Sequence, residues 1–470
     1  MATSPSHREG GWGWAVVLAC FVTEFIAFGN LKALAILITS MKEDFGTELW
    51  VVGSIVSLHY AVQYIMSPLA AALARKLGIR SLILVGGTLY GVGLVVSALT
   101  PSVAIFAISL AVVSGTGIAC TLDLIHAEVT FYFQEKYALA VFISSSGSPV
   151  GMMLYGPITQ VLMDTYGWRG AMLLLGGFSF HLVLGGMLVR RPTASYQEVP
   201  DHEEHHTIDG KNSPGISTDE AKPTKRVVSN PLNSVFSALC LEVFFSADFM
   251  ILAAKRMLYS IAFGGSVIYI VPNGLALGLT TSEVAFLTTA WGVGDLAGML
   301  LSAWTFHIKV LSVQNVEVLA VIVSVLGLLL QPFVASFVGQ TVLVLIVGVG
   351  MGCTVQGILV MTRWLPFGDD KFVIVFGWQT FLSGAAASIG DTLSGWLSDA
   401  TGSFHATFFL YSATMAAILL CLLQDVIRII SPPESSKQRG LMVLMPSLFK
   451  RDSSMIFERM PIQPNTNSAQ

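Results

Sequence analysis

Two ionisable side chains, Glu24 and Lys32, interrupt the apolar run from residue 9 to residue 40. They lie eight residues apart, which is about two helical turns, so a helix would carry them on roughly one face. An ionised group at the centre of a bilayer costs about 3 kcal/mol or more on insertion scales. Such groups usually face a bundle interior and mark a pathway. The pair therefore indicates a site that binds ions or a proton.

Three further ionisable side chains lie in other apolar runs. Asp123 and His126 are three residues apart, a spacing that places them on one helix face, and Asp391 lies in the run from 371 to 397. They fit a polar pathway through a helix bundle. They also fit structural hydrogen bonds between helices, or helix ends that reach the headgroups, and spacing alone leaves these alternatives open.

The composition places these residues in a multi-spanning membrane protein. Of 470 residues, 54% are hydrophobic and 11% are charged, against about 25% charged in soluble domains. The net charge is -4 and the sequence contains no dense basic stretch, which argues against nucleic-acid binding. Five scattered cysteines form neither a disulfide framework nor a metal-binding pattern. The sequence contains no HExxH or GxSxG motif, so we expect no enzyme activity and no cofactor.

Apolar windows of about 20 residues predict an all-α membrane protein with twelve spans. Six fall in each half of the chain, and a polar stretch that cannot bury a core separates the halves. The spans lie near 14–38, 48–73, 81–100, 102–126, 137–162, 168–189, 258–278, 284–306, 316–336, 338–361, 371–397 and 404–425. The predicted parts are an N-terminus (1–13), a six-helix bundle (14–189), a disordered linker (190–231), an interfacial lead-in (232–257), a second six-helix bundle (258–425) and a tail (426–470).

The distribution of cations predicts that both termini and the linker are cytoplasmic. With that orientation, Arg75, Lys76 and Arg80 lie inside, while little more than Lys42 and Arg169 lies outside. The segment 232–257 is apolar enough to touch the membrane but carries four charges, which favours an interfacial position. An extra crossing there would place the chain ends on opposite sides of the membrane.

Two stretches resemble signatures of the monocarboxylate transporter family. Residues 9–14 (EGGWGW) resemble the sequence that opens its first span, and residues 132–151 resemble its second signature, which leads into span five. The resemblance covers most of residues 9–192, and in the second half of the chain it is limited to short separate stretches. It implies the major facilitator fold and a plasma-membrane location. Some members of this family also need a single-span immunoglobulin-type ancillary protein.

The resemblance also implies a binding site. In the family, a lysine in span one, with an aspartate and an arginine four residues apart in span eight, is thought to bind the carboxylate and carry the coupled proton. The lysine and the aspartate fall on Lys32 and Asp295, but the arginine position is Met299. Asp295 could pair with Lys32 or take up the coupled proton. A thioether cannot offer a carboxylate the bidentate fork of a guanidinium. Anion binding would therefore rest on Lys32, and Glu24 would distinguish this chain from its relatives.

These features predict a secondary active or facilitative transporter of a small organic acid that works by alternating access. The substrate would be a monocarboxylate or a carboxylate-bearing zwitterion, carried with or without a coupled proton. The alternative is a membrane interaction protein that keeps the transporter fold but does not transport. The predicted partners are the lipid bilayer and a small carboxylate, and no nucleic acid.

Overall fold

The computed structural model describes residues 10–133, 136–190, 239–308, 311–367 and 369–430, and within these ranges every regular element is a helix. Apolar runs favour helices in lipid because a helix satisfies its own backbone hydrogen bonds where no water is available. The predicted linker (190–231) and tail (426–470) lie almost entirely outside the described ranges, as do residues 1–9.

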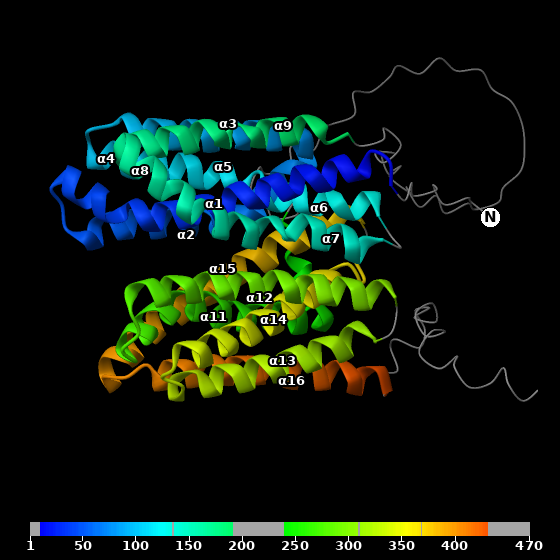
Figure 1. Cartoon of the computed structure of the whole chain (residues 1–470). Helices are drawn as coiled ribbons and strands as arrows, with labels where there is room; N and C mark the ends of the chain where they lie inside the picture. The colour runs from blue at the N-terminus through cyan, green and yellow to red at the C-terminus, as the bar shows by residue number, and fades with distance from the viewer. Residues whose placement is uncertain (1–9, 134–135, 191–238, 309–310, 368, 431–470) are drawn as a thin grey trace, which may run out of the picture. The chain divides into compact units, whose positions relative to one another are not determined.

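The N-terminal half forms helices that run alongside one another (Figure 1). The fourth predicted span is interrupted by a π-helical turn, η1, and by a break near Thr121. The elements are α1 (Gly13–Phe45), α2 (Leu49–Leu77), α3 (Ile79–Leu99), α4 (Val103–Ala107), η1 (Ile108–Ser114), α5 (Gly115–Ala119), α6 (Leu122–Tyr132), α7 (Tyr137–Ser145), α8 (Gly147–Ser179) and α9 (His181–Leu188).

A reversal at Gly167 divides the fifth and sixth spans. The continuous apolar stretch Tyr137–Leu188 has 52 residues, and a straight helix of that length would extend about 78 Å, more than twice the bilayer core. Gly167 has φ 67° and ψ 175°, a backbone conformation that breaks the helix and suits glycine. Eleven stretches of the described chain can cross a membrane by length and composition, and dividing this one at Gly167 gives the expected twelve.

The C-terminal half begins with a short 3₁₀ turn and continues with long helices. Hydroxyl side chains cap several of them, and Thr280 forms a capping box with Glu283 at the start of α12. The elements are η3 (Leu241–Phe245), α11 (Ala247–Ala276), α12 (Thr281–His307), α13 (Val313–Leu330), η4 (Gln331–Phe333), α14 (Phe337–Thr362), α15 (Asp369–Thr401) and α16 (His405–Ile430).

The start of α11 differs from the sequence prediction. The helix begins at Ala247, whereas we expected an interfacial segment to residue 257 and a span from 258. Ser246 caps it by accepting a hydrogen bond from the Phe249 amide. The helix tolerates Lys255 within the bundle because Glu317 of α13 compensates its charge.

The two halves meet inside the unit formed by residues 1–421. The α2 helix packs on α15, α6 also contacts α15, and α12 contacts α7 and α8. One apolar cluster draws residues from both halves, among them Val16, Ala71 and Ile374, close to the beginning of α1 and the end of α2. A second cluster, which includes Leu37 and Val52 toward the opposite ends of the same helices, contains residues of the N-terminal half alone. The shared apolar core therefore lies toward one end of the helices.

Candidate functional site

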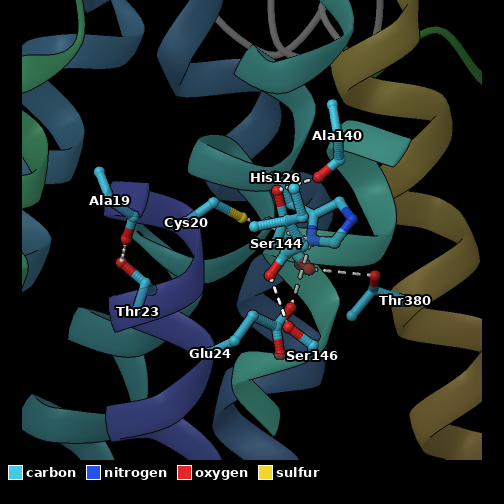
Figure 2. Close-up of polar contacts among 11 residues, drawn as sticks. Ala19, Cys20, Thr23, Glu24, His126, Ala140, Ser144, Ser146 and Thr380 are labelled. Carbon is cyan, nitrogen blue, oxygen red and sulfur yellow. Dashed lines mark hydrogen bonds and ion pairs between the residues drawn. The ribbon is translucent and has the colours of Figure 1, made fainter. Parts of the chain in front are cut away.

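Glu24 and His126 form a buried ion pair between α1 and α6. The distance from His126 Nδ1 to Glu24 Oε1 is 3.2 Å, and the two residues are 5% and 8% exposed respectively. The Sγ atom of Cys20 lies 3.6 Å from the same ring nitrogen (Figure 2). On the C-terminal half, the Phe376 ring stacks on the imidazole, with centroids 5.4 Å apart. Two residues predicted as site residues, 102 positions apart in the chain, are thus in contact.

Asp123 joins three helices across the two halves. Ser67 of α2 donates a hydrogen bond to its Oδ2 atom. Thr380 of α15 donates to its Oδ1 atom over 3.2 Å. Because Asp123 and His126 lie on the same face of α6, the pair Glu24–His126 and the carboxylate of Asp123 line one region between the halves.

The guanidinium of Arg256 on α11 lies in the same region, and the sequence analysis missed it. Its charge is within electrostatic range of Asp123 and Glu24. Its Cζ atom lies 5.4 Å from the centre of the Phe376 ring. The Nε and Nη1 atoms are buried and have no hydrogen-bond partner among the described residues. The available signal was the adjacent pair Lys255 and Arg256 inside an apolar run, which we assigned to the membrane surface.

The charge of Lys255, the neighbour of Arg256, is compensated by Glu317. Its Nζ atom lies 3.3 Å from Glu317 Oε2, and both side chains are fully buried. The Sδ atom of Met361 lies at the same distance from the ammonium group. Of two consecutive cations on α11, Lys255 therefore has an ion-pair partner, whereas Arg256 makes no ion pair within the described ranges.

A pairing of Lys32 with Asp295 is not seen in this structure. Lys32 is half-buried and makes no ion pair or hydrogen bond with any part of the chain that the structure describes. Asp295 is 2% exposed, and its Oδ1 atom has no hydrogen-bond partner within the described ranges. The backbone of Asp295 packs closely on Gly348 and Gly352 of α14.

The remaining two predicted residues lie in the C-terminal half. Met299 is buried one turn after Asp295 and also packs beside Gly352. Asp391 on α15 is half-buried, its Oδ1 atom has no partner in the described structure, and it faces Gly264 of α11. The structure does not join either residue to the Glu24–His126 pair by a recorded contact.

The site therefore holds buried acids, one imidazole and a guanidinium with two unbonded donor atoms between two helical halves. Among the described residues, no group of three or more His, Cys, Asp or Glu side chains could hold a metal ion. Buried charges between packed halves are typical of secondary transporters, whose binding sites lie near the bilayer midplane.

Comparisons with known proteins agree with that class. The Major Facilitator Superfamily model matches residues 20–363, so the chain belongs to this superfamily of transporters and is not an enzyme. Among solved structures, the E. coli fucose:proton symporter FucP has a TM-score of 0.66 and 15% identity, covering 88% of this chain and 99% of its own. That likeness shows the fold.

Curated relatives are monocarboxylate transporters. Monocarboxylate transporter 12-B of Danio rerio is 28% identical over 455 residues, which cover 95% of this chain and 94% of the relative. Human monocarboxylate transporter 12 is also 28% identical, over 89% of this chain and 82% of the relative. Human monocarboxylate transporter 2 is 25% identical, over 88% of this chain and 85% of the relative. The family resemblance expected from the sequence signatures is confirmed, for a divergent member.

Proposed function

We propose that this protein carries a small organic acid across the plasma membrane by alternating access. The observation that supports this most directly is the buried polar region between the halves, in which Asp123 of α6 bonds to Thr380 of α15. The names of the relatives indicate a monocarboxylate, and a zwitterion with one carboxylate belongs to the same class of substrate.

In this proposal the shared apolar cluster closes the cytoplasmic end of the protein. That end holds the start of α1 and the end of α2, which the cation distribution assigns to the cytoplasm. A second FucP structure, described as being in the outward conformation, has a TM-score of 0.64 with this chain. Substrate would enter from the opposite side, and separation of α2 and α6 from α15 would release it to the cytoplasm.

The Glu24–His126 pair is our candidate for the coupled proton. The pair is buried in this state and stacks on Phe376 of the other half, so movement of the halves changes its surroundings. Such a change can alter the proton affinity of both groups. Asp295, whose Oδ1 atom has no partner in the described structure, is a second candidate.

Uptake by purified protein in proteoliposomes tests the function. We expect uptake of at least one of lactate, pyruvate or β-alanine above that of protein-free liposomes, with saturation. Stimulation by an inward proton gradient would support coupling. If none of a wider set of small acids is taken up and none raises the unfolding temperature, the transport proposal fails and the interaction-protein alternative is favoured.

A further inference from the structure

We propose that Arg256 on α11 binds the substrate carboxylate, in place of the arginine that the family resemblance puts at position 299 of α12. This rests on the proposed transport function and names the residue that recognises the anion. The sequence analysis instead expected Lys32 alone to bind the carboxylate.

Three buried polar groups on the adjacent helices α11 and α12 have no hydrogen-bond partner in the described structure, and Tyr259 links the other two. They are the Nε and Nη1 atoms of Arg256, the hydroxyl of Tyr259 and the Oδ1 atom of Asp295. Arg256 and Tyr259 are three residues apart on α11 and so share a face. Tyr259 is within electrostatic range of both Arg256 and Asp295. Native proteins rarely leave buried polar atoms unsatisfied, so this grouping points to a ligand.

The protein's own acids do not satisfy this guanidinium. Glu24 is paired with His126, and Asp123 accepts hydrogen bonds from Ser67 and Thr380. Both are within electrostatic range of Arg256 but neither hydrogen-bonds to it. They help to hold the cation in a buried place while leaving its donors available. Buried donors without acceptors are costly, and a bound carboxylate would offset that cost with a bidentate contact.

The position of Arg256 explains how the chain can have Met299 and still recognise an acid. In the family pattern, the arginine lies four residues after the aspartate on span eight. Here Asp295 remains on α12, and the cation lies on the neighbouring helix α11, with Tyr259 within range of both. The guanidinium and the Tyr259 hydroxyl can donate to one carboxylate together.

Pairs of acids and their amides test the proposal with purified full-length protein. The probes are lactate against lactamide and β-alanine against β-alaninamide, measured by thermal unfolding and by uptake. We expect wild-type protein to be stabilised by an acid and not by its amide. Arg256→Gln should abolish that stabilisation and raise the apparent KM about 10-fold or more, and Tyr259→Phe should raise it less. Arg256→Lys should retain part of the binding.

Arg80→Gln is the matched control, because it removes an exposed cation at the end of the bundle. It should leave binding and uptake unchanged. If Arg256→Gln folds and takes up the acid with unchanged KM, the assignment of Arg256 is wrong while the transport function stands. If wild-type protein neither binds nor takes up any acid, the proposed function fails and this inference fails with it. Equal binding of acid and amide would also overturn it.

Discussion

The Glu24 carboxylate and the His126 imidazole are in contact where neither has much access to water. Within the described structure, Asp123 and Arg256 are within electrostatic range of this pair, and the Cys20 thiol contacts the imidazole. Phe376 of the other half stacks on the imidazole, so separation of the halves would change the surroundings of the pair. This is why we propose the pair as the coupling site.

Replacement of Glu24 by Gln should uncouple transport from the proton gradient. The amide keeps the shape of the side chain but cannot take up a proton, so we expect gradient-driven stimulation of uptake to fall to the level seen without a gradient. Counterflow exchange, which needs no net proton movement, should persist. Glu43→Gln, an exposed change on the same helix, is the control. Equal gradient stimulation in Glu24→Gln and wild-type protein would contradict this role.

Lys255→Met should destabilise the protein strongly. It removes the cation that pairs with the fully buried Glu317 side chain, and breaking a buried pair in this way costs about 3–5 kcal/mol. The unfolding temperature of purified protein measures the effect. Lys371→Met is the control, because it breaks the exposed pair with Glu242 and should change little. Adding Glu317→Leu to Lys255→Met should restore much of the loss, and no recovery would argue against an ion-pair origin.

Individual site residues could be predicted from sequence where a charge broke an apolar run. Glu24, Asp123 and His126 were found in this way, but the contact of His126 with Glu24 depends on how α1 packs on α6. Arg256 was missed because the segment 232–257 carries four charges, which is typical of an interfacial segment. The buried partner of Lys255 lies 62 residues further along the chain, and the sequence does not reveal that pairing. Spacing along one helix predicts a shared face and does not predict partners on other helices.

Close backbone contact between α12 and α14 holds Asp295 in place. A Cβ atom at Gly352 would lie 2.0 Å from the Asp295 carbonyl oxygen, and one at Gly298 would lie 2.1 Å from the Val349 carbonyl oxygen. Small residues permit such approach where lipid gives no hydrophobic drive for helix association. The glycines of these two helices therefore position the acid.

Gly352→Ala should separate α12 from α14 and lower stability by about 1–3 kcal/mol, because the obstructing atom is backbone and cannot rotate away. Uptake should fall as Asp295 shifts. Gly156→Ala is the matched control, since a Cβ there meets nothing within 4 Å. The unfolding temperatures of the two variants test this prediction. Equal values would show that α12 and α14 can accommodate the extra methyl group without loss of stability.

The helices themselves were largely predictable, because a long apolar run in lipid has few alternatives to a helix. The residues at which the helices begin and end were harder to predict. The start of α11 depends on the Ser246 cap and on compensation of Lys255 by another helix, and the π-helical turn in the fourth span has no evident signal in the sequence.

The two halves must separate at their shared apolar cluster if transport is by alternating access. Gly377 of α15 lies against α2, where a Cβ atom at that position would be 3.2 Å from the Cβ of Ala71. Disulfides need a Cβ separation of about 3.5–4.5 Å, so a small adjustment would allow a bond between cysteines at these two positions. Four of the five native cysteines are buried, which limits their competing reactions, and the half-buried Cys421 should be replaced by Ser in the background used for cross-linking.

Uptake by the double variant Ala71→Cys and Gly377→Cys, oxidised and then reduced in proteoliposomes, tests alternating access most directly. The single variants, treated in the same way, are the controls. We expect uptake of the acid to fall to background when the cross-link is complete, and to return on reduction. Undiminished uptake by fully cross-linked protein would contradict movement of the halves at this contact and the mechanism that depends on it.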